Sequence, residues 1–163
     1  MLAQRMELAL NQQVNAELWS AYLYLSMSYD MDNKGYGGMA SWFAGQAKEE
    51  FGHASRLMKY IGETGGKVAL QPIAEVKQTW ATPLDAFEET LKHEMVVTAN
   101  FNKLMDLALE LKDYATQIEL QWYISEQVEE ENIARNIIEK LQRIGNSIVG
   151  LYAVDQQLGK RAS

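Results

Sequence analysis

The feature that most constrains the fold is a repeat of apolar residues spaced alternately four and three positions apart, which runs through four long stretches of the sequence. These stretches cover residues near 4–32, 37–64, 83–110 and 113–144, and a shorter helical stretch near 147–158 follows them. An α-helix brings positions three and four residues apart onto one face, whereas a β-strand needs alternation with a period of two. The sequence therefore predicts an all-α fold in which each long helix buries one apolar face.

The connections between these helices predict how they are arranged. Short turns near residues 33–38 and 110–113 join the first helix to the second and the third to the fourth, so each pair should be antiparallel. Residues 65–82 contain a proline and cannot form one continuous helix, but when extended they reach about 59 Å, more than the roughly 42 Å length of a long helix here. The second and third helices should therefore be parallel. We expect one domain over residues 1–163: a four-helix bundle near 4–144 with one long crossover and a short C-terminal helix.

Composition excludes several classes of function. The sequence has no cysteine, which excludes disulfides, thiolate metal sites and cysteine nucleophiles. Its net charge of −7 disfavours binding to nucleic acid or to anionic membranes. No apolar run approaches the roughly 20 residues of a transmembrane helix, and the start of the chain lacks the pattern of a signal peptide. We therefore expect a cytoplasmic protein with no nucleic-acid partner and no membrane partner.

Each apolar face is interrupted near the middle of its helix by polar side chains. The residues concerned are Glu17 in the first helix, Glu50 and His53 in the second, Glu94 in the third, and Gln127 and Glu130 in the fourth. Because the four helices are of similar length, these interruptions should meet at one level of the bundle. Burying an unpaired carboxylate is costly, and several carboxylates at one point would repel each other severely. The sequence therefore predicts a cation between them.

An internal repeat relates the two halves of the chain. The same offset of 77 residues connects four pairs of positions: Glu17 and Glu94, Glu49 and Glu126, Glu50 and Gln127, and His53 and Glu130. The two helical hairpins should therefore present matching positions around a pseudo-two-fold axis. Taken one at a time, a buried glutamate or a Glu-x-x-His pattern would indicate structure only. Their shared level and symmetric spacing favour a metal site.

The types of side chain indicate which metal the site binds. Carboxylates with one imidazole suit iron or manganese better than a soft metal. The four negative charges of Glu17, Glu50, Glu94 and Glu130 match the charge of two Fe(II) ions. Oxidation to Fe(III) adds positive charge, which oxygen species derived from O₂ or water would balance. The sequence therefore favours O₂ chemistry at a di-iron centre.

A second acidic group lies at the edge of the predicted centre. Glu126 and Glu129 flank the helix face that carries Glu130, and Glu49 is the repeat partner of Glu126. These side chains would provide a third, more exposed metal position, or they would only form a solvated helix face.

Three neighbouring aromatic or histidine side chains have more ordinary interpretations. Tyr24 lies two helical turns after Glu17 and is expected to be a core tyrosine whose hydroxyl hydrogen-bonds a ligand, with a redox role as the alternative. His93 lies off the apolar face beside Glu94, which is typical of a surface or subunit-contact histidine. Trp122 is expected to serve packing.

In combination, these motifs resemble the bacterial and archaeal non-haem ferritins. The resemblance covers essentially the whole chain and rests on Asn15-Ala16-Glu17 with Tyr24, Glu49-Glu50-Phe51-Gly52-His53, His93-Glu94, and Gln121-Trp122-Tyr123 through Glu126-Gln127-Val128-Glu129-Glu130-Glu131. It implies a ferritin-like bundle, iron storage and detoxification, and a ferroxidase that oxidises Fe(II) with O₂ or H₂O₂. It also implies a homo-oligomeric cage, a 24-mer, that encloses Fe(III) mineral.

The resemblance also implies a role for each site residue. A first iron would be held by Glu17, Glu50 and His53, a second by Glu50, Glu94 and Glu130, and a third by Glu49, Glu126, Glu129 and Glu130. In this assignment Glu50 bridges the first two ions. Gln127 would orient bound oxygen species by hydrogen bonding, and Tyr24 completes the catalytic set.

Departures from related families narrow the resemblance. Gln127 and Glu130 replace the second Glu-x-x-His of bacterioferritin and of many di-iron oxygenases. Gly52 stands where bacterioferritin has its haem-ligand methionine, so no haem is expected. Rubrerythrin requires cysteines, which this chain lacks. The DNA-binding miniferritins take ligands from a subunit interface, whereas this chain carries its own set. Two alternatives are left open: a di-iron oxygenase acting on an organic substrate, and a non-enzymatic bundle that binds partners or serves as an iron reservoir.

Overall fold

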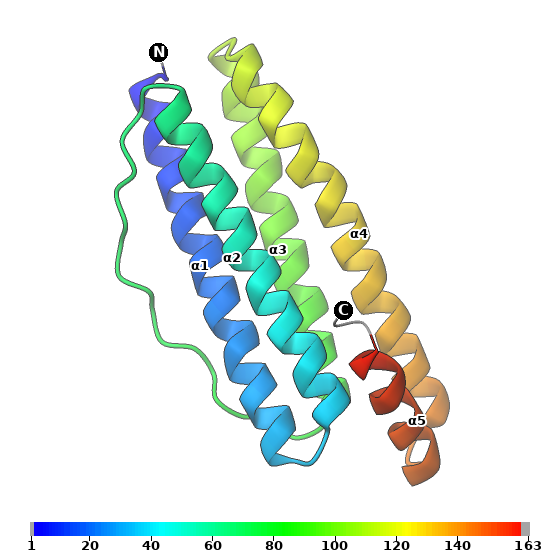
Figure 1. Ribbon diagram of the computed structural model, residues 1–163. Helices are drawn as coiled ribbons and strands as arrows, with labels where there is room; N and C mark the ends of the chain where they lie inside the picture. Colours follow the sequence, from blue (N-terminus) through cyan, green and yellow to red (C-terminus); the bar gives the residue numbers. More distant parts are fainter. Residues whose placement is uncertain (1, 161–163) are drawn as a thin grey trace.

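The computed structural model describes residues 2–160 and contains five helices in that part of the chain (Figure 1). They are α1 (Gln4–Asn33), α2 (Gly37–Glu63), α3 (Pro83–Glu110), α4 (Tyr114–Ile144) and α5 (Ile148–Gly159). No residue of 2–160 lies in a strand, so the all-α prediction is confirmed, and each helix bound lies within one residue of its expected position. None of these five helices combines the length and apolar character that a membrane crossing requires.

Local side-chain hydrogen bonds explain where three of the helices begin. Thr82 caps α3: its hydroxyl accepts from the backbone N–H of Asp85 at 3.1 Å, and the Asp85 carboxylate accepts from the Thr82 N–H at 2.9 Å. Pro83 follows at the first helical position, where a missing N–H leaves no hydrogen bond unmade. Asp113 caps α4 and Ser147 caps α5, each through a 3.0 Å bond from a backbone N–H.

The start of α2 is capped by a side chain from α5. Tyr36, which precedes α2, makes no side-chain cap, and the carboxylate of Asp155 accepts instead from the Met39 N–H at 2.8 Å. Gly38 allows this close approach, because a Cβ at that position would lie 1.8 Å from the Asp155 carbonyl oxygen. α5 is therefore fixed across the first turn of α2, and it also packs on α4.

The helices form a four-helix bundle with one long crossover, as predicted. α1 and α2 make one antiparallel pair, α3 and α4 make another, and α1 packs on α3 (Figure 1). Residues 64–82 run along α1 from the end of α2 to the start of α3, so α2 and α3 are parallel (Figure 1). The side chains of α1 donate hydrogen bonds to backbone carbonyls along this crossover: Asn11 to Lys67, Asn15 to Gln71 and Pro72, Trp19 to Glu75, and Ser26 to Lys77. These bonds satisfy carbonyls of a segment that has no helix or strand ladder of its own.

The buried apolar residues form two clusters, one towards each end of the bundle. In α1 the last buried residue of one cluster is Val14, and the first buried residue of the other cluster is Leu23. The buried residues of the other long helices also pass from one cluster to the other, after Phe43 in α2, Phe87 in α3 and Tyr123 in α4. The interruptions of the four apolar faces therefore lie at one level, where a polar layer separates the two apolar clusters.

Candidate metal centre

The side chains of this polar layer come from all four long helices, and each is at most 7% exposed. The layer contains Glu17 of α1, Glu50 and His53 of α2, Glu94 of α3, and Gln127 and Glu130 of α4. The structure thus brings together the residues that interrupt the predicted apolar faces. Apolar side chains cannot replace the water that these polar groups lose on burial, so the groups need hydrogen bonds or opposite charges within the layer.

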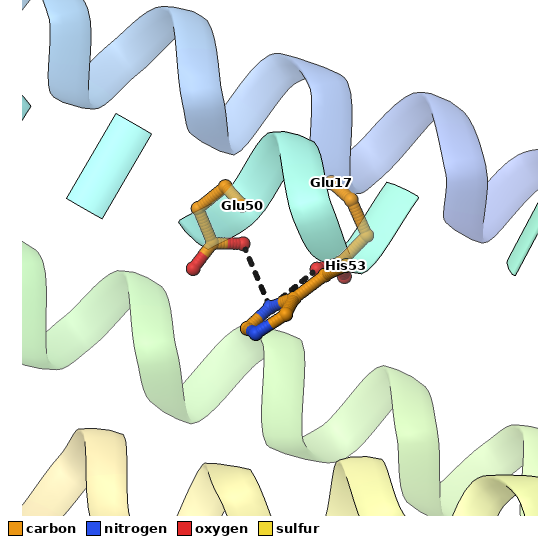
Figure 2. Close-up of side chains that lie close together, drawn as sticks. All are labelled: Glu17, Glu50 and His53. Carbon is orange, nitrogen blue, oxygen red and sulfur yellow. Dashed lines mark ion pairs between the residues drawn. The ribbon is translucent and has the colours of Figure 1, made fainter. Parts of the chain in front are cut away.

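Glu17, Glu50 and His53 form the tightest cluster within the layer (Figure 2). Each offers one ligand atom, and these atoms lie within 4.8 Å of one another. His53 Nδ1 is 3.4 Å from Glu17 Oε2 and 3.6 Å from Glu50 Oε2. Divalent ions such as zinc bind imidazole nitrogen and carboxylate oxygen at about 2.1 Å, so two ligands of one ion lie up to about 4.2 Å apart. The cluster therefore has close to the spacing that a single ion requires.

The ligand atoms of this cluster make no hydrogen bonds. Glu17 Oε2, both carboxylate oxygens of Glu50, and His53 Nδ1 are all buried without a hydrogen-bond partner. A buried polar group in this state destabilises the fold, and a charged group does so more strongly. A cation between the three side chains would satisfy these atoms together, so the donor set fits a metal ion.

The charges of the layer shift the pKa values of its members. Burial raises the pKa of Glu50 well above its ordinary value, and the neighbouring charges of Glu17 and Glu94 add to that effect against the opposing influence of His53. Burial also raises the pKa of Glu94. Burial alone would lower the pKa of His53, but Glu17 and Glu50 outweigh it and raise this pKa from 6.5 to about 10. In the absence of a metal ion, His53 therefore carries a proton at neutral pH that a bound ion must displace.

Glu94 is held by two residues that the sequence analysis singled out. The Tyr24 hydroxyl donates to Glu94 Oε1, and Gln127 Nε2 donates to Glu94 Oε2 at 3.0 Å. Burial raises the pKa of Tyr24 well above its ordinary value, so its hydroxyl keeps the proton that it donates. The interpretation of Tyr24 as a core tyrosine bonded to a candidate ligand is confirmed. The expected role of Gln127 towards oxygen species stays a prediction.

Two further glutamines, to which the sequence pattern assigns no role, hold carboxylates of the layer. Gln13 Nε2 donates to Glu17 Oε1 at 2.6 Å, and Gln46 Nε2 donates to Glu130 Oε2 at 2.9 Å. Both glutamines are buried. The available signal was their position, because Gln13 lies one helical turn before Glu17 and Gln46 lies one turn before Glu50, on the same faces.

The second and third predicted metal positions are less closely formed than the first. Within residues 2–160, no other set of three acidic or histidine side chains brings ligand atoms as close as Glu17, Glu50 and His53 do. Glu94 and Glu130 complete the layer beside that cluster. Their assignment to a second ion stays a prediction.

The residues predicted for a third position surround an open pocket of about 340 Å³ beside the layer. The pocket is lined by Glu49, Gly52, His53, Trp122, Glu126, Glu129, Glu130 and Ile133. His53 and Glu130 therefore belong both to the buried layer and to the pocket wall. A cation in the pocket would lie among several carboxylates that face solvent.

Trp122 and His93 pack beside the layer. Trp122 meets His53 edge-on, with ring centroids 5.4 Å apart, in agreement with the packing role expected of it. His93 is less exposed than the expected surface histidine. Its ring packs against Trp19 at 5.3 Å and shares a 2.7 Å hydrogen bond with Ser20 Oγ, so it is half-buried between α1 and α3. Burial lowers the pKa of His93.

A four-helix bundle with one crossover that buries carboxylates and an imidazole from all four helices has the architecture of carboxylate-bound di-metal proteins. A family model described as Ferritin-like domain matches residues 7–144. The chain therefore belongs to the ferritin-like family, as the resemblance in its sequence indicated.

Individual relatives match over the whole chain. The bacterial non-heme ferritin of Bacteroides fragilis (strain 638R) is 40% identical over 161 residues, which cover 99% of this chain and 100% of that protein. The bacterial non-heme ferritin of Campylobacter jejuni is 40% identical over 158 residues, which cover 97% of this chain and 95% of that protein. Among solved structures, an open pore ferritin from the hyperthermophilic archaeon Archaeoglobus fulgidus is 42% identical, covers 99% of both chains and has a TM-score of 0.98. The similarity therefore includes the crossover and α5.

Proposed function

We propose that this protein stores iron and removes free Fe(II), and that it acts as a ferroxidase: Fe(II) binds in the buried polar layer and is oxidised there by O₂ or H₂O₂. The observation that carries the proposal is the set of buried ligand atoms without hydrogen-bond partners on Glu17, Glu50 and His53. Family membership and the non-heme ferritin names of the relatives support iron as the cation. Iron is here the substrate and the cargo.

We assign the first Fe(II) to Glu17, Glu50 and His53, and a second to Glu50, Glu94 and Glu130. Glu50 suits the bridging position because neither of its oxygens makes a hydrogen bond, so each is available to a different ion. By contrast, Glu94 accepts from its neighbours at both oxygens. Glu94 lies near enough to Glu50 for its charge to add to the raised pKa of Glu50.

Binding and oxidation are linked to proton and electron transfer. Because the pKa values of Glu50, Glu94 and His53 are all raised, binding of Fe(II) releases protons from the layer. Each Fe(II) gives up one electron, so two ions reduce one O₂ to H₂O₂ with two protons, or one H₂O₂ to two molecules of water with two protons. The protein keeps the ligands in place: Tyr24 and Gln127 orient Glu94, and the amide of Gln127 is our candidate for orienting the oxygen species.

We assign the open pocket to the next step, in which iron leaves the layer. Glu49, Glu126 and Glu129 would hold a third ion there together with Glu130, because all four line the pocket. Glu130 also belongs to the second position, so one carboxylate connects the two. Carboxylate oxygens suit Fe(III) as well as Fe(II).

Storage as a mineral requires an enclosed space, so we propose a homo-oligomeric cage, a 24-mer, in the cytoplasm. Exposed apolar side chains support contacts between subunits, because a monomer in water rarely exposes such groups together. Tyr22, Leu25 and Tyr29 are 41–66% exposed and follow each other along one face of α1. At the other end of the chain, Ile148 and Val149 of α5 are 85% and 80% exposed.

Stepwise aerobic loading with Fe(II), followed by desalting, tests the proposed storage function. The expected result is retention of far more iron per chain than the two or three ions that fit in the bundle. Saturation at that small number would instead indicate a di-iron enzyme that acts on an organic substrate. If no iron were retained, the metal function would be wrong.

The ferroxidase step is tested separately with Glu94→Ala. Removing this candidate ligand should slow aerobic Fe(II) oxidation by at least tenfold, whereas Glu110→Ala should leave the rate unchanged. Glu110 is a matched control because it ends the same helix and its ion pair with Arg5 is exposed. Equal rates for the parent protein and Glu94→Ala would favour a passive iron reservoir.

A further inference from the structure

The amide group of Gln46 is only half satisfied in the structure, although the side chain is fully buried. Its Nε2 donates to Glu130 Oε2 at 2.9 Å, while its carbonyl Oε1 has no hydrogen-bond partner. A carboxylate only accepts hydrogen bonds, so the amide nitrogen must face Glu130 and the oxygen must face away from it. Gln46 thus combines a fixed donor with an unused buried acceptor in the polar layer.

The position of this acceptor relates it to the metal centre. Gln46 lies one helical turn before Glu50 on the same face of α2. The two polar atoms of an amide are about 2.3 Å apart, so Oε1 lies within about 5 Å of the Glu130 oxygen that Nε2 binds. A cation bound to Glu130 would carry water molecules, and one such water can span this distance with a normal hydrogen bond.

Glu130 is the carboxylate whose orientation matters most for movement of an ion. It belongs to the buried layer, and it also lines the acidic pocket with Glu126 and Glu129. A glutamate between two metal positions can bind an ion at either of them, and the orientation of its carboxylate determines which. Gln46 belongs to α2 and holds one oxygen of Glu130, which belongs to α4.

We propose that Gln46 is a positioning residue of the metal centre: its amide N–H holds Glu130 at the buried position, and its carbonyl oxygen accepts a hydrogen bond from water on a cation beside Glu130. This inference rests on the proposed function, because it assumes that the layer binds metal ions. Gln46 should therefore influence the ion that uses Glu130 and leave the ion at Glu17 and His53 unchanged. Loss of such supporting contacts typically weakens metal binding by about 10–100-fold.

Anaerobic titration of the metal-free full-length protein with Co(II) tests this inference without any oxidation step. Calorimetry gives the number of ions per chain and their affinities, and the visible spectrum of Co(II) reports the ligand geometry of each ion. We expect the parent protein to bind at least two ions. Gln46→Leu should weaken one of them by about tenfold or more and leave the spectrum and affinity of the other unchanged.

A second substitution separates positioning from general packing. Gln46→Glu keeps the size of the side chain but loses the N–H that holds Glu130. It places a carboxylate oxygen where it can bind the cation directly, and this added ligand should offset the lost N–H, so the variant should bind the affected ion at least as tightly as the parent protein. A merely structural role predicts that both variants weaken every ion alike. Gln117→Leu is the matched control, because it removes one hydrogen bond to the Ala108 carbonyl at a half-buried site outside the polar layer.

The outcomes distinguish this inference from the proposed function. Parent-like Co(II) binding by Gln46→Leu would overturn the positioning role while leaving the ferroxidase proposal intact, and equal losses in Gln46→Leu and Gln46→Glu would also overturn it. A parent protein that binds no Co(II) and no Fe(II) would refute both proposals. Should Gln46→Leu lose its helical circular dichroism, Gln46→Met, which keeps the unbranched chain length, replaces it and carries the same expectation.

Discussion

The charge of Glu50 is predicted to destabilise the metal-free protein, so Glu50→Gln should stabilise it. Both carboxylate oxygens of Glu50 are buried without hydrogen-bond partners, and so is the Oε2 atom of Glu17. Burial raises the pKa of Glu50, which means that the fold favours its uncharged form. Glutamine has nearly the same shape and removes the charge. It also brings an N–H group into the cluster, where a small rotation of the side chain lets it donate to Glu17 Oε2.

The size of this effect follows from the contacts that change. A hydrogen bond to a charged acceptor contributes about 1.5–3 kcal/mol to stability. The 3.6 Å contact between His53 and Glu50 is weakened, but His53 keeps its 3.4 Å contact with Glu17. We therefore expect a net gain of about 1–2 kcal/mol in the free energy of unfolding, or about 2–8 °C in melting temperature for a chain of this length.

Urea unfolding at neutral pH with a chelator measures this gain, and Glu49→Gln is the matched control. It makes the same change of charge one residue earlier in α2, at an exposed position, and should alter stability by no more than about 0.5 kcal/mol. With Co(II) present, Glu50→Gln should instead be less stable than the parent protein, because it removes a candidate ligand of the buried layer. No gain in the metal-free state would show that water fills the empty layer. An equal gain in the control would show a general effect of net charge, and either result would refute the reasoning from desolvation.

Further predictions concern pH, Tyr24 and α5. In the metal-free fold the pKa of Glu50 and that of Glu94 lie above 4.5, and that of His53 is about 10 instead of 6.5. The folded state therefore binds more protons than the unfolded chain, so the stability of the metal-free protein should fall as pH rises from about 5 to about 10. Urea midpoints that rise over this range would contradict the raised pKa values of these three groups. Tyr24→Phe should weaken anaerobic Co(II) binding and slow Fe(II) oxidation severalfold, because the hydroxyl donates to Glu94; slower oxidation with unchanged binding would indicate a redox role instead. Asp155→Ala removes the acceptor for the Met39 N–H and should speed amide hydrogen exchange in α5 more than in α4; equal exchange would show that apolar packing alone holds α5.

The fold was predictable because its determinants are local or periodic. Apolar residues at spacings of four and three define each helix, and the lengths of the connections then leave few arrangements of four helices. The cap of α2 was not predictable in the same way. Asp155 lies 116 positions after Met39, and an acidic residue in a short terminal helix looks like a surface residue until the helices are packed.

The candidate ligands were predictable because a charge on an apolar helix face is costly and therefore conspicuous. Glu17 and Glu94 stand out for this reason, and both are buried. Gln13 and Gln46 were missed because an uncharged amide costs less to bury than a charge and so gives a weaker signal on the same face. Their roles depend on which carboxylate each amide reaches, and that is set by side-chain rotamers and helix packing, which sequence spacing does not specify.

The use of neutral amides has a consequence for metal binding. Within residues 2–160, no lysine or arginine forms an ion pair with Glu17, Glu50 or Glu94, so the negative charge of these side chains is not cancelled by a fixed cation. Gln13 and Gln127 orient two of these carboxylates and add no positive charge. A fixed cation would stabilise the empty protein but would repel an incoming metal ion. The layer therefore keeps its ligands in position without a fixed positive charge. The bound metal ion balances the negative charge of the carboxylates, and before it binds the proton on His53 balances part of it.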